Sequence, residues 1–93
     1  MTQSVALTEA ETRYLAQVRE DCEGCLGPNA VLLDLRLEPA SEGMRLVAWY
    51  RLGAREHESA ASGETMLAAH ANLRAQILVD RIRIGYSELV DHR

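Results

Sequence analysis

The residues best suited to chemistry in this chain are the two cysteines of Cys22-Glu-Gly-Cys25, whose spacing is used by zinc ligands and by dithiol redox sites. Zinc needs further ligands, and His70 is the best candidate because it lies on the apolar stripe of an expected helix, with His57 and His92 as weaker candidates. A zinc-stabilised module using Cys22, Cys25 and His70 is therefore one hypothesis. Cysteine is often a small core residue, however, and a histidine on such a stripe is often structural. We expect no cofactor.

The charges around this cysteine pair disfavour redox chemistry. Both thiols are expected near the C-terminal end of a helix among Glu20, Asp21 and Glu23, and each of these features opposes formation of a thiolate. No Ser-His-Asp or Cys-His arrangement can be assigned elsewhere, and no glycine-rich phosphate loop follows an expected strand. We therefore expect a protein without enzymatic activity.

A hairpin in the middle of the chain indicates binding instead of catalysis. Apolar residues alternate over 30–38 and 43–53, which predicts two strands joined by the loop 39–42. One face of the hairpin is apolar, and the other holds three apolar residues and three arginines: Leu32, Val47, Trp49, Arg36, Arg45 and Arg51. A sheet face open to water has little reason to hold the only tryptophan of the chain. We expect a protein partner to cover this face, with an ordinary face that a loop or tail of the chain partly shields as the second interpretation.

The expected loop fixes a register for the hairpin. The apolar pairs would be Leu37 with Met44, Leu35 with Leu46, Leu33 with Ala48 and Val31 with Tyr50. On the other face Arg36 is then opposite Arg45, and Leu32 is opposite Trp49. Facing arginines repel each other unless an anion or an acidic side chain lies nearby.

Single-stranded nucleic acid is the alternative ligand for this face. Trp49 would stack on a base while Arg36, Arg45 and Arg51 bind phosphates. Acidic residues at positions 34 and 38 lie close enough to satisfy the arginines, and the net charge of −4 repels a polyanion. Nucleic acid therefore ranks below a protein partner, which includes a second copy of the chain.

Two helices are expected to flank the hairpin. Thr8-Glu9-Ala10-Glu11 matches a capping box and predicts a helix over 8–25 that Gly27 and Pro28 end. The small and charged segment 53–63 is expected to be an exposed connection, in which Ser59 or Ser62 caps a second helix over 63–84. Gly85 would end that helix. Alternatively, the helix ends near position 80 and residues 82–86 form a short third strand.

The order of these elements predicts an α+β fold of the αββα type. Two helices pack on one face of an antiparallel β-hairpin, with the short C-terminal strand as the alternative, and residues 1–93 form a single small domain whose residues 86–93 are a candidate loose tail. A two-stranded sheet is only marginally stable and leaves both of its edges unpaired. We therefore expect a homodimer.

Composition narrows the cellular setting. The first residues hold no basic segment and no long apolar run, so we expect neither a secretory signal nor a membrane span, and the two cysteines fit reduced thiols in the cytoplasm. The sequence thus predicts a cytoplasmic, non-enzymatic interaction or accessory module that self-associates through the hairpin face around Trp49.

Overall fold

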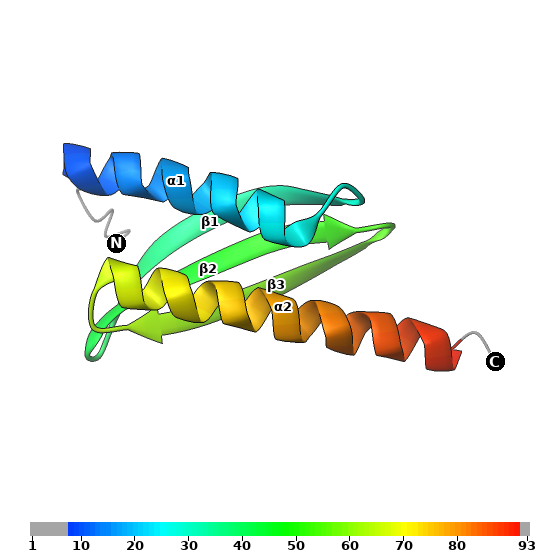
Figure 1. The fold of residues 1–93 in the computed structure, drawn as a ribbon. Helices are drawn as coiled ribbons and strands as arrows, with labels where there is room; N and C mark the ends of the chain where they lie inside the picture. The colour runs from blue at the N-terminus through cyan, green and yellow to red at the C-terminus, as the bar shows by residue number, and fades with distance from the viewer. Residues whose placement is uncertain (1–7, 92–93) are drawn as a thin grey trace, which may run out of the picture.

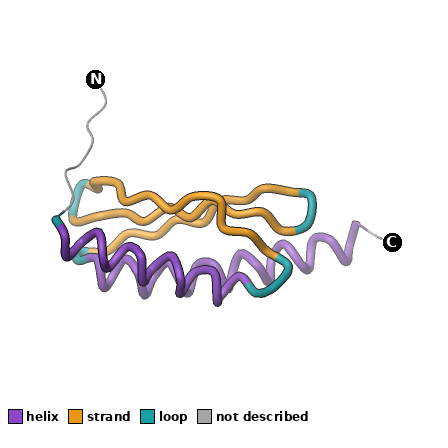
Figure 2. Tube along the Cα trace, turned by 90° about the horizontal axis from the view of Figure 1, so that it is seen from above, coloured by secondary structure: helices purple, strands orange, loops and turns teal. Residues whose placement is uncertain are grey.

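The computed structural model describes residues 8–91, so the expectation that residues 1–7 hold no export signal lies outside it. The elements follow the order α1 (Glu9–Leu26), β1 (Ala30–Ala40), β2 (Gly43–Leu52), β3 (Arg55–Gly63) and α2 (Met66–Asp91). The strands form one antiparallel sheet in the order β1-β2-β3, and both helices lie on the same face of it (Figures 1 and 2). The α+β class is confirmed. The third strand lies in the middle of the chain, so the expected C-terminal strand is wrong.

The capping box of α1 is confirmed in both directions. The backbone N–H of Thr8 donates to the Glu11 carboxylate over 3.0 Å, and the N–H of Glu11 donates to the Thr8 hydroxyl over 3.1 Å. Gly27 then ends the helix with a φ of 85°, a conformation that favours glycine. No helix within residues 8–91 is both long and apolar enough to cross a membrane.

The register expected for the first hairpin is wrong by two residues between Asp34 and the turn, and by one residue for Val31. Ala40 pairs with Gly43, so the loop holds only positions 41 and 42, and Leu37 faces Leu46. The tight turn requires a positive φ at Gly43, and glycine adopts the observed value of 104° without strain. The expectation of a longer loop failed because the strand continues through Pro39, an edge position where a missing N–H breaks no ladder bond.

A β-bulge at Leu33 exchanges the two faces of β1 in the first half of the strand, so that the side chains expected in the core point away from it. The register shifts between Leu32 and Asp34, which leaves Leu33 as an extra residue. Leu32 then packs against the core on the helix side, while Val31 and Leu33 are exposed. The expectation that Val31 and Leu33 face the core, with Leu32 on the opposite face, is therefore wrong for this half of the strand.

The segment expected to be an exposed connection is the edge strand β3. It pairs with β2 so that His57 faces Tyr50 and Ser59 faces Ala48. The side chains of His57, Ser59 and Ala61 alternate with those of Glu56 and Glu58, as a strand requires. The strand was not predicted because its residues are small or polar and do not form the apolar alternation that indicates a strand.

Helix α2 starts later and ends later than expected. Thr65, and neither Ser59 nor Ser62, accepts a hydrogen bond from the backbone N–H of Ala68, over 3.1 Å. The helix passes through Gly85 to Asp91, so an end at Gly85 and a strand over 82–86 are both wrong. Its C-terminal end extends beyond the sheet, and residues 92 and 93 of the expected tail lie outside the described residues (Figures 1 and 2).

The core lies between the sheet and the helices. Its fully buried members come from α1, the central strand and α2: Val18, Cys22, Leu26, Leu46, Ala48, Tyr50, Ala69, Leu73 and Ile77. Gly63 at the end of β3 lies directly against the backbone of Ala68 and Ala69. The close approach of the first turn of α2 to the sheet therefore depends on a residue without a side chain.

Candidate functional site

Most of the residues predicted to bind a partner share the sheet face that the helices leave open. Residues 46, 48 and 50 of β2 are buried on the helix side, so its odd-numbered residues face the other way. We call the following residues of this outer face the Trp49 surface: Arg36, Arg45, Val47, Trp49 and Arg51. Leu32 does not belong to it, because the bulge turns Leu32 toward the core.

Trp49 is held in a defined orientation and remains accessible. Its indole N–H donates to the Glu56 carboxylate of β3 over 2.8 Å, and 39% of the residue is exposed. Val47 is only 3% exposed, because it lies between its ladder neighbours Arg36 and Ala60. A partner could therefore bury additional surface of Trp49 but very little of Val47.

The arginines of the Trp49 surface have acidic neighbours. Arg36 is opposite Val47, not Arg45 as expected, and its guanidinium lies 3.4 Å from the Asp34 carboxylate. Arg45 is opposite Glu38, and the closest atoms of that pair are 4.0 Å apart. The charges thus form an alternating pattern, which leaves less positive potential for phosphates than facing arginines would.

The histidine proposed as a zinc ligand has other partners. His70 Nε2 lies 2.8 Å from the Asp21 carboxylate, and His70 Nδ1 lies 3.0 Å from the Tyr14 hydroxyl. An ionised carboxylate only accepts, so Nε2 donates to Asp21, and in the neutral imidazole Nδ1 then accepts from Tyr14. Within residues 8–91, no group of three or more His, Cys, Asp or Glu side chains is placed to hold a metal ion. The structure therefore does not bring His70 together with Cys22 and Cys25 as a ligand set.

The two cysteines are free thiols in different surroundings. Burial raises the pKa of the Cys22 thiol to about 12, and the nearby Cys25 and Asp21 act in the same direction. Cys25 is only partly buried. We therefore expect iodoacetamide at about pH 8 to alkylate Cys25 in the folded protein and Cys22 only after denaturation.

Intact-mass spectrometry would follow this alkylation over time. The Cys25→Ser variant should show no fast labelling until denaturant is added. Equal labelling rates of both thiols in the folded wild-type protein would contradict the buried, protonated state of Cys22.

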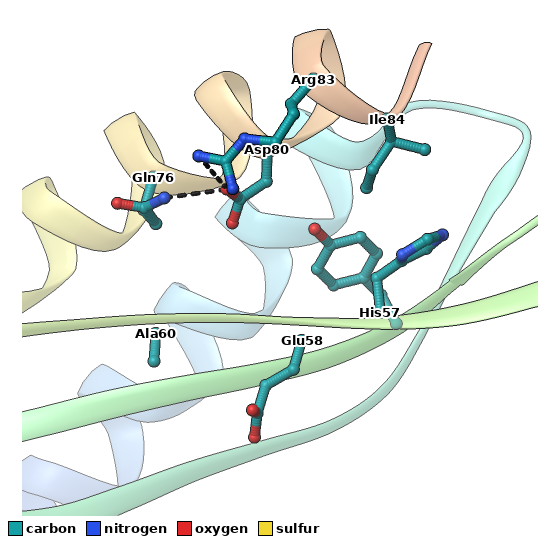
Figure 3. Close-up of a pocket in the computed structure, with 8 residues that line it drawn as sticks. His57, Glu58, Ala60, Gln76, Asp80, Arg83 and Ile84 are labelled. Atoms are coloured by element: carbon teal, nitrogen blue, oxygen red, sulfur yellow. Dashed lines mark hydrogen bonds and ion pairs between the residues drawn. The ribbon is translucent and has the colours of Figure 1, made fainter. Parts of the chain in front are cut away.

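A chain of buried hydrogen bonds joins the sheet to α2. Ser59 donates to the Asp80 carboxylate over 2.6 Å, so the Tyr50 hydroxyl, 2.7 Å away, donates to Ser59. Gln76 donates to the second Asp80 oxygen over 2.9 Å (Figure 3). Burial raises the pKa of the Tyr50 hydroxyl above its ordinary value. Sequence reasoning missed this chain because it placed Ser59 in a loop.

A cavity of about 370 Å³ opens beside this hydrogen-bond chain, between β3 and the second half of α2. We call it the β3 groove. His57, Glu58 and Ala60 line it from the strand, and Asp80 and Arg83 are among its residues from the helix. His57 Nε2 is buried and has no hydrogen-bond partner in the part of the chain that the structure describes.

A third exposed feature runs along the outer side of α2. It consists of apolar side chains that recur at helical spacing and that we call the α2 stripe: Leu78, Val79, Ile82 and Tyr86. Ile82 is 73% and Tyr86 is 70% exposed. These residues span the middle of α2 and the half that leads to its projecting C-terminal end.

Comparisons with protein-family models, with curated proteins and with solved structures find no match to this chain. The arrangement of residues 8–91 is therefore the basis for a functional proposal.

Proposed function

We propose that this chain is a small, non-enzymatic interaction module of the cytoplasm that forms a homodimer through the Trp49 surface. One observation carries the proposal: Trp49 stands on the central strand of a sheet whose helices cover only the opposite face. Aromatic residues supply much of the binding energy of protein interfaces, and an exposed tryptophan in the middle of a sheet is a typical anchor.

The neighbouring residues also suit a second copy. The bulge leaves Leu33 exposed beside Asp34, which is opposite Trp49 in the ladder. Acidic and basic side chains alternate on the same face, where Arg36 pairs with Asp34. Because a twofold axis brings a surface against itself, a face with both charges can place opposite charges together.

The α2 stripe is the second candidate for the self-contact. Its side chains are more exposed than Trp49, and they lie on a helix that projects beyond the sheet. Residues 79, 82 and 86 follow the alternating three- and four-residue spacing with which helices pair. A test of the dimer must therefore separate the two surfaces.

Size-exclusion chromatography with light scattering, over a range of concentrations, tests the proposal. We expect a wild-type dimer and a Trp49→Lys variant that dissociates at concentrations about 30-fold higher or more, because a central anchor contributes about 2 kcal/mol or more. Lysine is preferred to glutamate because Trp49 faces Glu58 and bonds to Glu56. Circular dichroism should show unchanged helical content.

The matched control is Ile82→Lys, which introduces the same charge on the α2 stripe and should leave the dimer intact. The opposite result, with a dimer weakened only by Ile82→Lys, would move the self-contact to α2. A monomeric wild-type protein would refute self-association. Fluorescence anisotropy with labelled single-stranded DNA and RNA at low salt would then test the nucleic-acid alternative.

A further inference from the structure

The two edges of the sheet differ in how they are protected. On β1, Pro39 has no N–H, Leu33 forms the bulge, and the N–H of Leu35 donates to the Asp34 carboxylate over 2.9 Å. Proline and bulges are among the devices that prevent another strand from pairing with an edge. The β1 edge is therefore blunted.

The β3 edge contains no proline and no bulge. The backbone carbonyl of Ser62 accepts from the Asn72 side chain of α2 over 2.8 Å, so this residue points its backbone away from β2. Backbone groups alternate in direction along a strand, so those of Glu56, Glu58 and Ala60 point outward as well. Only Ser62 has its outward carbonyl occupied among the described residues.

The β3 groove lies next to these outward groups. Glu58 and Ala60 line it from the strand, and Arg83 and Ile84 line it from α2. Figure 3 shows His57 on the helix side of β3 and Glu58 pointing to the opposite side. A strand added to this edge would therefore place alternate side chains in the groove and on the outer face of the sheet.

We propose that β3 accepts an extended segment of another protein as a fourth strand. The backbone of the segment pairs with Glu58 and Ala60, and one of its side chains, a hydroxyl or an amide, enters the groove beside His57, whose buried Nε2 bonds to it once the imidazole turns toward the groove. Such groups both donate and accept, so they suit either tautomer of the imidazole. Strand addition of this kind draws affinity from the main chain and specificity from pockets for alternate side chains.

The charge of Glu58 indicates which side chains the segment carries on the outer face of the sheet. Glu58 is exposed and forms no ion pair within residues 8–91, and the chain carries a net charge of −4. Opposite charges directly across a ladder stabilise pairing. The segment therefore carries lysine or arginine on the outer face, next to the polar residue that enters the groove.

The test is an ¹⁵N-HSQC titration of the full chain with a peptide of the length of β3 in which lysine and threonine alternate. We expect saturable shifts centred on the amides of Glu58 and Ala60 and on the His57 ring. A peptide in which glutamate and threonine alternate should bind at least about tenfold more weakly. Shifts spread over the whole acidic surface, or none up to the solubility limit, would overturn the proposal.

Variants separate strand addition from general charge attraction. Ala60→Pro removes an outward N–H that β2 does not use, and it should weaken binding of the lysine peptide by about tenfold. Glu58→Lys should transfer the preference to the glutamate peptide, whereas the same charge change on α1, Glu20→Lys, should leave the preference unchanged. If Ala60→Pro fails to fold, the comparison of Glu58→Lys with Glu20→Lys still tests whether the peptide binds beside Glu58. Equal effects of these two charge variants would overturn the proposal.

The Trp49 surface can be tested separately with Trp49→Ala, which adds no charge opposite Glu58. Titrations with this variant should keep the binding at β3 and the preference for the lysine peptide. Concentration-dependent protection of the β3 amides without any peptide would identify a second copy as the added strand, and would overturn the assignment to a different protein.

Discussion

Gly63→Ala is expected to lower the free energy of unfolding by about 2 kcal/mol or more. A Cβ at this position would lie 2.7 Å from the carbonyl carbon and 2.8 Å from the Cβ of Ala68, and it would also meet the backbone nitrogen of Ala69. Backbone atoms of a helix cannot turn away as a flexible side chain can. The first turn of α2 would therefore have to move off the sheet, which would loosen the packing of Ala69 in the core.

Urea denaturation followed by circular dichroism would measure this loss. The control is Gly85→Ala, because a Cβ built at Gly85 inside α2 has no heavy atom within 4 Å apart from its chain neighbours and the adjacent backbone of its own helix. Alanine should stabilise that helical position by about 0.5–1 kcal/mol. Two variants with the same small effect would mean that α2 does not approach β3 as closely as described.

Asp80→Ala is expected to destabilise the fold by about 2–3 kcal/mol. The substitution removes the acceptor of Ser59, whose side chain is almost fully buried and could not turn to water. It also removes the acceptor of Gln76 and the partner of Arg83, which lies 3.7 Å away. Asp80→Asn keeps a carbonyl oxygen for Ser59, so we expect it to lose only about 1 kcal/mol.

A double-mutant cycle would isolate the unpaired hydroxyl. Ser59→Ala together with Asp80→Ala should destabilise the fold by less than the sum of the single changes, because the double variant leaves no orphaned donor at Ser59. Strict additivity in urea denaturation would show that Ser59 and Asp80 do not bond to each other in the folded protein.

The sequence identified the parts of the fold that depend on local rules. The capping box at Thr8 and Glu11 sets the start of α1 within one residue of the expected position, and the apolar alternation of β2 places Leu46, Ala48 and Tyr50 on the buried face as expected. Both signals lie within a few neighbouring residues, so no knowledge of distant contacts was needed.

The failures occur where distant contacts decide. Strand β3 is stabilised by its ladder to β2 and by bonds such as that from Ser59 to Asp80, and neither is visible in a run of small and charged residues. The bulge at Leu33 is likewise invisible, because Leu32 and Leu33 are the same residue type and either could face the core. Only the packing of Leu32 against the helices selects one of them.

The candidate sites divide in the same way. Strand alternation predicted that Trp49 lies on the outer face of the sheet, and the structure confirms this position. The partners of His70 could not be foreseen, since Tyr14 and Asp21 lie on the other helix, 56 and 49 residues away in the chain. The β3 groove was missed together with the strand that forms it, and an isolated histidine in a presumed loop gave no signal for it.

The unequal edges of the sheet limit the size of any assembly built from it. A sheet that is open on both sides can add strands without end, which is how filaments grow. Here the bulge and Pro39 close the β1 side. When β3 of one copy pairs with β3 of a second copy, the joined sheet ends at a β1 strand on both sides, so no open edge remains for a third copy.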